Sequence, residues 1–317
     1  MALELPTLRI SLAGFSLEQQ DTLRQMLQQD RLTRQAWEIS TPEDADALWI
    51  NGARTQLLAD GLLRVASGVP AGRSMQIDPT SLNRPAAFSL PVPWQFPACL
   101  TFEIESGSVA KVLWELENQL RPLIAQFCLA SRILEHEAAL GSGVYRVERG
   151  DGTLLAVVDL RGDVGVLTNA SAPDFDNAVW TPQPRRADQI PAPFLRCTLS
   201  KLMWEYALRT TRDVLPPRYR TDALYFRRPP RLPQRLLQDA HLLVLRELSS
   251  EPATLTDLQQ RTGLDAETLA RHLAALYLVG AVTSNPRRAA PMASQPPESM
   301  EGVHSTQASF ATSRQEM

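Results

Sequence analysis

The amino-acid sequence predicts an α/β protein made of several units, and three observations lead to this prediction. Apolar runs and helical patterns alternate over residues 8–93, as expected for a parallel sheet with helices on both faces. A long helical pattern at 108–140 is followed by period-two alternation at 143–170, which indicates a central α+β region with an antiparallel meander. A further helical region covers residues 236–285.

We divide the 317-residue chain where these patterns change. The expected parts are an N-terminal α/β unit, a long helix with the meander, an Arg/Pro-rich segment, a C-terminal helical module and a tail, at 1–105, 106–208, 209–235, 236–288 and 289–317. The tail is rich in Ser, Pro and Gln and holds few large apolar residues, so we expect it to be disordered.

The N-terminal unit combines expected strands with two expected helices. Short apolar runs predict the strands at 8–14, 37–40, 47–51, 74–78 and 86–93. The first helix is expected over 16–30, where Ser16 is a suitable N-cap and Gln19 occupies the capping-box position. The second helix is expected over 55–67, in the segment TQLLADGLLRVAS.

The central region begins with the helical pattern at 108–140, which Pro122 is expected to kink or divide. Three strands are expected within 143–170, joined by the turns GDG and RGD. The stretch at 171–192 is rich in Pro, Asp and Asn and predicts a loop. The apolar spacing at 194–211 predicts one more helix.

Three positions at expected strand ends of the N-terminal unit are occupied by Gly14, Asn51 and Leu90. The element order over 8–93 resembles that of response-regulator receiver domains, which have a flavodoxin-like α/β fold. In that family an acidic pair at the first position binds magnesium, an aspartate at the second accepts phosphate, and a lysine at the third contacts it. The resemblance therefore implies a pseudo-receiver without phosphotransfer chemistry. An α/β domain unrelated to signalling is the alternative.

The C-terminal module has the apolar spacing of a three-helix core, with Thr254 as an N-cap. This pattern resembles a winged helix-turn-helix. If the module binds DNA, the resemblance implies that Thr268, Arg271 and His272 of the third helix face the bases. Residues 238–288 hold five arginines against six acidic residues, which opposes phosphate binding. A protein-contact or structural role is therefore the alternative.

The Arg/Pro-rich segment is strongly basic, although the whole chain has a net charge of −3. It contains eight arginines, two acidic residues and no lysine. Arginine forks bind phosphate or carboxylate in a bidentate manner and stack on flat rings, so the segment predicts an anion-binding site. A solvated linker whose arginines pair with neighbouring acidic surfaces is the alternative. The candidate ligand-binding residues are Arg218, Arg220, Asp222, Arg227, Arg228 and Arg231.

A cyclic dinucleotide such as cyclic-di-GMP fits this pattern, because it presents two phosphates and two guanines. The fragments RYR and RRPPR resemble the spaced arginines of cyclic-di-GMP sites, but they do not match the RxxxR plus [DN]xSxxG pattern of PilZ domains. The chain as a whole is similar to bacterial non-enzymatic effectors of the pilus-associated cyclic-di-GMP receptor type. That similarity implies a signalling protein that acts through an unidentified protein partner in pilus or surface-motility control. The alternatives are a winged-helix transcriptional regulator with an unphosphorylatable receiver-like domain, and a scaffold that binds only protein.

Other classes of function lack a motif in the sequence. There is no GxSxG, Walker loop, GxGxxG or HExxH, so we predict no catalytic residues and no cofactor. Cys99, Cys128, Cys197 and the four histidines are scattered, so we predict no metal site. The sequence has neither a run of about 18 apolar residues nor a secretory signal, which predicts a cytoplasmic protein without membrane insertion.

Overall fold

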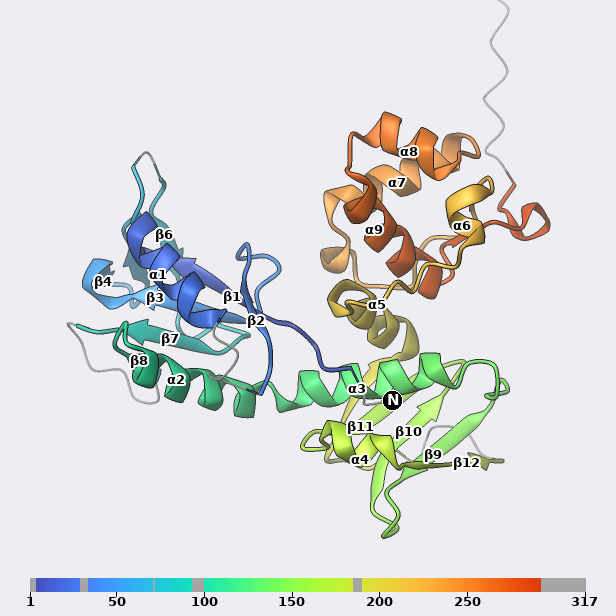
Figure 1. Ribbon diagram of the computed structural model, residues 1–317, viewed down its shortest axis with the longest axis horizontal. Coiled ribbons are helices and arrows are strands. Elements are labelled where there is room, and N and C mark those ends of the chain that lie inside the picture. The colour runs from blue at the N-terminus through green and yellow to red at the C-terminus, as the bar shows by residue number, and fades with distance from the viewer. Residues whose placement is uncertain (1–3, 29–33, 71, 93–99, 185–189, 292–317) are drawn as a thin grey trace, which may run out of the picture.

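The computed structural model describes residues 4–28, 34–70, 72–92, 100–184 and 190–291; Cys99 and the predicted tail from residue 292 lie outside them. Figure 1 shows an N-terminal α/β unit on the left, a central α+β unit at the lower right and a C-terminal helical unit above it. The chain is therefore of the predicted mixed α/β class, with a parallel sheet in its N-terminal unit.

Five strands of the N-terminal unit form the parallel sheet: β1 Leu8–Ala13, β2 Trp37–Ile39, β3 Ala47–Asn51, β7 Ala86–Ser89 and β8 Leu100–Phe102. Their order is β2-β1-β3-β7-β8, and each neighbouring pair is parallel. Helix α1, Leu17–Leu27, begins at the predicted capping box. Gln19 donates its backbone N–H to Ser16 Oγ (3.3 Å), and Ser16 donates its own to Gln19 Oε1 (3.0 Å).

Residues 55–67, predicted to be a helix, instead form a β-hairpin. Strands β4 Thr55–Leu57 and β5 Leu63–Val65 pair antiparallel, and β6 Met75–Ile77 completes a small sheet in the order β4-β5-β6. The turn contains Gly61, whose φ of +84° suits glycine and would strain other residues. The helix prediction is wrong because the hairpin buries alternate residues, Leu63 and Val65, which a short apolar run does not distinguish from helical spacing.

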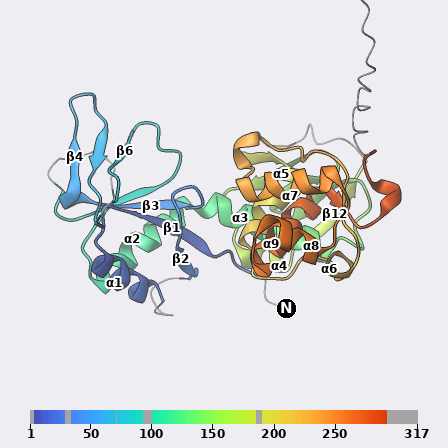
Figure 2. The ribbon, with the colours of Figure 1, turned by 90° about the horizontal axis from the view of Figure 1, so that it is seen from above.

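The parallel sheet lies between two different layers. Helices α1 and α2, the latter at Ser106–Gln119, cover one face, and β4, β5 and β6 lie on the other (Figure 2). Ile10 and Trp49 pack in the same core as the helices, whereas Ile50 and Phe88 pack with the small sheet. Successive residues of a strand point to opposite faces, which explains this division. The prediction of helices on both faces is therefore wrong.

The central unit starts where α2 ends, and α3, Arg121–Glu135, follows after a break at Leu120. The predicted division at Pro122 is confirmed, since proline occupies the first turn of α3, where its missing N–H costs nothing. The predicted meander is also confirmed, with strands β9 Val144–Glu148, β10 Leu154–Asp159 and β11 Asp163–Leu167. Arg161 and Gly162 of the RGD sequence lie in the turn between β10 and β11, and Asp163 begins β11.

The stretch predicted to be a loop at 171–192 contains α4, Ala172–Asp176, and β12, Val179–Gln183. Strand β12 tolerates Pro182 because it lies at the sheet edge, in the order β12-β9-β10-β11-β13. The helix predicted at 194–211 is correct only in part, because β13, Phe194–Thr198, precedes α5, Leu199–Arg209. Pairing of β13 with β11 accounts for the difference.

The C-terminal unit contains the three predicted helices, α7 Asp239–Ser250, α8 Leu255–Thr262 and α9 Ala266–Leu278. The Arg/Pro-rich segment packs on this unit through α6, Arg218–Thr221, and β14, Tyr225–Phe226, which pairs antiparallel with β15, Val282–Thr283. Helix α5 also contributes to this core, because its Trp204 belongs to the same buried cluster as Leu273 of α9 and its ring contacts His241 of α7. Among the described residues, no helix has both the length and the apolar character that a bilayer crossing requires.

Candidate functional site

The pairing of β14 with β15 places arginines of the Arg/Pro-rich segment against the end of α9. The backbone N–H of Arg227 donates to Ala281 O (2.8 Å), directly after β14. Gly280 turns the chain between α9 and β15 with a φ of +68°. A Cβ at Gly280 would lie 3.1 Å from Arg228 Nη2 and 3.4 Å from Arg227 Nη1, so this glycine leaves room for both guanidinium groups.

Two hollows that share lining residues lie here, and we call them the arginine hollows. The larger, about 440 Å³, is bounded by the turn between β10 and β11, the start of α5 and the end of α9. The smaller, about 350 Å³, is bounded by α6, the end of α9 and the residues that follow β15. Their charged lining residues are Arg161, Arg227, Arg228 and Arg231 in the larger, Arg218, Arg227 and Arg288 in the smaller, and Glu137 in both.

Among the described residues, the hydrogen bonds that the arginines of the hollows donate go to neutral acceptors. Arg228 donates from Nε to Gly280 O (3.2 Å) and from Nη2 to Val279 O (3.4 Å), which are carbonyls at the end of α9. Within the described part of the chain, none of these arginines forms an ion pair with a carboxylate. Burial, and then the charges of Arg227 and Arg231, lower the pKa of Arg228. A bound anion would relieve this repulsion between like charges.

One carboxylate lies among these arginines. Glu137 follows the end of α3, where its backbone N–H donates to Leu134 O (3.2 Å), and its side chain is exposed. It lines both hollows together with Tyr277, which is half-buried. Burial, and then the charge of Glu137, raise the pKa of the Tyr277 phenol. The site therefore combines several cations, one carboxylate and two aromatic rings, Tyr277 and Tyr219, whose centroids lie 4.8 Å apart.

The structure brings together four of the six residues that the sequence predicts as ligand-binding: Arg218, Arg227, Arg228 and Arg231. The other two lie elsewhere. Arg220 forms an ion pair with Asp213 (2.7 Å) and lines a separate cavity, and exposed Asp222 accepts a hydrogen bond from the Thr221 hydroxyl (2.9 Å). Residues two positions apart in a helix do not face each other, so the short helix α6 directs Arg218 and Arg220 to different sides.

Comparisons of the chain with models of protein families, curated proteins and solved structures found no match. The function of the site is therefore inferred from its geometry. Among the described residues, no three His, Cys, Asp or Glu side chains are grouped as the ligands of a metal ion would be.

Three residues that line the hollows, Arg161, Arg288 and Glu137, were not predicted as site residues. Arg161 belongs to the RGD turn, Arg288 to the segment after β15 and Glu137 to the end of the long helical region. Each comes from a part of the chain whose local pattern indicates only a turn or a helix end. No signal in the sequence identifies them, because tertiary packing alone brings them to the site.

The residues predicted to face DNA are placed unfavourably for that role. His272 is buried, with 9% of its surface exposed, and its Nδ1 lies 2.8 Å from Nε2 of buried His241. The prediction that His272 contacts bases is wrong, because it lies on the face of α9 that packs in the core with Leu269. Arg271 pairs with Glu267 (3.0 Å), and the backbone N–H of Thr268 caps the helix by donating to Asp265 Oδ1 (2.9 Å).

The carboxyl edge of the parallel sheet, where the receiver resemblance places phosphate chemistry, is closely packed. Asn51 is 4% exposed and donates from Nδ2 to Gln19 Oε1 (3.2 Å). Gly14 has a φ of +80°, and a Cβ on it would lie 2.8 Å from Val65 Cγ1 and 3.3 Å from Asn51 Cβ. No side chain can be added at Gly14 without displacing its neighbours.

The first arginines of the Arg/Pro-rich segment connect the N-terminal and central units through carboxylates, of which Asp46 is buried. Arg209 bonds Asp46 next to β3 (2.8 Å) and also contacts Glu205. Arg212 bonds Glu135 at the end of α3 (2.6 Å) and Glu4 of the N-terminal segment (3.3 Å).

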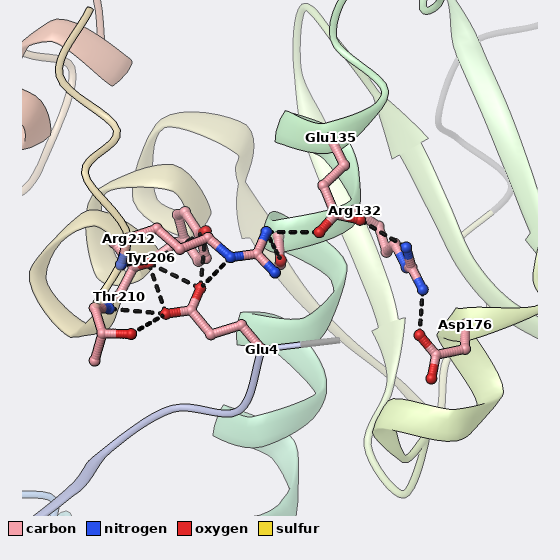
Figure 3. Close-up of polar contacts among 9 residues, drawn as sticks. Glu4, Arg132, Glu135, Asp176, Tyr206, Thr210 and Arg212 are labelled. Carbon is pink, nitrogen blue, oxygen red and sulfur yellow. Dashed lines mark hydrogen bonds and ion pairs between the residues drawn. The ribbon is translucent and has the colours of Figure 1, made fainter. Parts of the chain in front are cut away.

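Figure 3 shows that Glu4 also accepts hydrogen bonds from the last turn of α5 and from the residues that follow it. The Thr210 hydroxyl donates at 2.8 Å, the Thr211 backbone N–H at 2.8 Å and the Tyr206 hydroxyl at 3.2 Å. The same network continues from Glu135 to Arg132 (2.6 Å). These contacts fit the linker alternative for Arg209 and Arg212, but not for the arginines of the hollows.

Proposed function

We propose that this protein is a non-enzymatic receptor for an anionic nucleotide ligand, with cyclic-di-GMP as the favoured ligand, and that the arginine hollows bind it. The observation that carries the proposal is the convergence of arginines that form no ion pair with any described residue. They come to two hollows with shared lining residues from α6, from the residues after β14 and β15, and from the turn before β11. Guanidinium groups without carboxylate partners are ready to bind phosphate, because no existing ion pair must first be broken.

The shape of the site supports a ligand with two phosphates. Each hollow is within the size range of small-molecule pockets, roughly 300–1,000 Å³, and each has its own arginines. Arg227 lines both hollows, so it lies between the two expected phosphate positions. A cyclic dinucleotide would place one phosphate in each hollow and leave its bases free to stack on guanidinium planes or on Tyr277.

The remaining parts of the chain support a role as a signalling effector. We propose that the N-terminal unit is a receiver-like domain, because its strand order is the order of flavodoxin-like folds. We propose that the C-terminal unit is a winged helix, supported by three capped helices followed by a strand that pairs with β14. Because the residues for phosphotransfer are replaced, the signal that this effector receives is a bound ligand rather than a phosphate group.

The output of this effector is a contact with a protein partner. The larger hollow lies between the central and C-terminal units, so a bound ligand would contact both units at once. Ligand binding would thereby favour one arrangement of the two units over others. That arrangement sets the surface that the protein offers to its partner.

Titration calorimetry with cyclic-di-GMP tests the proposal. We expect saturable one-site binding, and we expect Arg227→Ala combined with Arg231→Ala to weaken it at least 100-fold, because each charge-assisted contact contributes roughly 1.5–3 kcal/mol. Neither side chain donates a hydrogen bond that holds the described fold, so the double variant should remain folded by circular dichroism.

The matched control is Arg220→Ala, which removes an arginine from the same segment but not from the hollows. Its affinity should equal that of the wild type. Absence of binding, or equal losses in the two variants, would overturn the proposal. Binding of random duplex DNA that weakens steeply between two salt concentrations, with no binding of the dinucleotide, would favour the winged-helix regulator instead.

A further inference from the structure

A site that binds only phosphate gains nothing from a carboxylate, yet Glu137 lines the arginine hollows. It is the one carboxylate among the described residues that line the arginine hollows, and it lines both of them. A negative charge at this position repels any simple anion that enters either hollow. A ligand that gains from Glu137 must therefore present hydrogen-bond donors close to its phosphates.

Guanine can satisfy both oxygens of this carboxylate, whereas adenine offers donors only from its N6 amino group. A carboxylate has two acceptor oxygens and no donor. The Watson–Crick edge of guanine carries adjacent N1–H and N2–H donors, which can bind both oxygens at once. Adenine presents the N1 lone pair at the corresponding position, and this acceptor would face the carboxylate with no proton between them. Proteins recognise unstacked bases through these edges and by stacking on aromatic or arginine planes.

The surroundings of Glu137 favour a base at this position. Tyr277 lines the same two hollows and is half-buried; its ring packs against Tyr219, with centroids 4.8 Å apart, and a base could extend this aromatic pair by stacking. Arg227 also lines both hollows, which places a phosphate-binding cation and a base-binding carboxylate at the same junction. The Glu137 backbone is fixed by its hydrogen bond to Leu134 O, so the carboxylate is attached to an ordered helix end.

We propose that Glu137 is a specificity-determining residue that selects guanine over adenine in the phosphate ligand of the arginine hollows. This inference rests on the proposed function, because it assumes that the hollows bind a nucleotide. It adds a base preference to the phosphate contacts of the arginines, which both nucleotides share.

The test compares cyclic-di-GMP with cyclic-di-AMP by calorimetry on the full chain. We expect the wild type to bind the guanine dinucleotide at least ten-fold more tightly. In Glu137→Gln the charge is removed and one acceptor is replaced by a donor, so the preference should fall to about three-fold or less. The control is Asp222→Asn, which removes an exposed acidic residue outside the hollows and should preserve the preference.

The outcomes separate the inference from the proposed function. Equal wild-type affinities for the two dinucleotides, or an unchanged preference in Glu137→Gln, would overturn the role of Glu137 while leaving the arginine site intact. Failure of both dinucleotides to bind would overturn the proposed function and this inference together. Loss of the preference in Glu137→Gln, with the affinity for cyclic-di-AMP kept or increased, supports the inference.

Discussion

Lowering the pH from 7 to 5 should destabilise the C-terminal unit through its buried pair of histidines. His241 is fully buried, and its Nδ1 accepts a hydrogen bond from the Gln238 backbone N–H (3.2 Å). Its Nε2 must therefore carry the proton of the neutral ring and donate to His272 Nδ1 (2.8 Å). The His241 ring also packs against Trp204, with ring centroids 4.4 Å apart. Neither ring nitrogen of His241 can accept another proton without losing a hydrogen bond or displacing a donor.

The size of this loss of stability follows from the difference between the His241 pKa in the folded state and in the unfolded state. Burial, and then the neighbouring His272, lower the pKa of His241 from 6.5 to about 3. In this interval the unfolded chain binds a proton that the folded chain does not, so stability is fully present above pH 6.5 and falls as the pH decreases toward 3. The free energy of unfolding falls by about 1.4 kcal/mol for each pH unit below 6.5. His241 alone therefore lowers it by about 2 kcal/mol at pH 5.

His272 acts in the same direction. Burial, and then the charge of Arg271, lower its pKa, while Asp44 and Asp265 oppose that shift. The lowered pKa of His272 adds to the loss of stability caused by His241. The two histidines together therefore lower the free energy of unfolding at pH 5 by more than about 2 kcal/mol.

Urea unfolding followed by tryptophan fluorescence, at several pH values between 5 and 7, measures this loss. The carboxyl groups with resolved shifts have pKa values lowered from 3.8 or 4.5, so they titrate below this range. Combined His241→Leu and His272→Leu substitutions should flatten the dependence of the unfolding free energy on pH, whatever their effect on its absolute value. His136→Gln changes an exposed histidine and should leave the slope as it is. A double variant that keeps the wild-type slope would refute the reasoning.

Two further predictions concern the N-terminal unit. Replacing Glu4 by Gln should lower the free energy of unfolding by about 1–3 kcal/mol, because an amide cannot accept all the hydrogen bonds that this carboxylate receives (Figure 3). Thermal denaturation measures the change, and a variant as stable as the wild type would contradict the importance of these contacts. Acetyl phosphate with magnesium should not label the protein, because Asn51 is a buried amide that bonds Gln19; a stable phosphoaspartate in the intact mass would show the contrary.

Elements with strong local signals could be predicted from the sequence. Ser16 and Gln19 form the expected capping box, and the proline at 122 divides the long helix where expected, because both effects depend on residues within one helical turn. Residues 55–67 could not be predicted in this way. Their apolar spacing fits either period, and burial against the parallel sheet selects the hairpin.

The candidate site could be predicted only in part for a similar reason. Charge density identifies Arg227 and Arg228 as unusual, but it does not tell which arginines of the segment meet a carboxylate. Arg209 pairs with Asp46, which lies 163 residues earlier in the chain, and this pairing depends on how the units pack. Glu137 is an ordinary helix-end residue in the sequence, and only its position beside the arginines gives it a chemical role.

The position of Glu4 also affects the order of events during protein synthesis. Glu4 is made 206 residues before Thr210, whose hydroxyl binds it. At about 5–20 residues per second, ribosomes need roughly 10–40 s to make that length. The sheet around β1 can assemble in this interval, but the N-terminal carboxylate stays hydrated until α5 has been made. The contact that Glu4 makes between the N-terminal unit and the residues around the end of α5 is therefore a later step in folding than assembly of the sheet around β1.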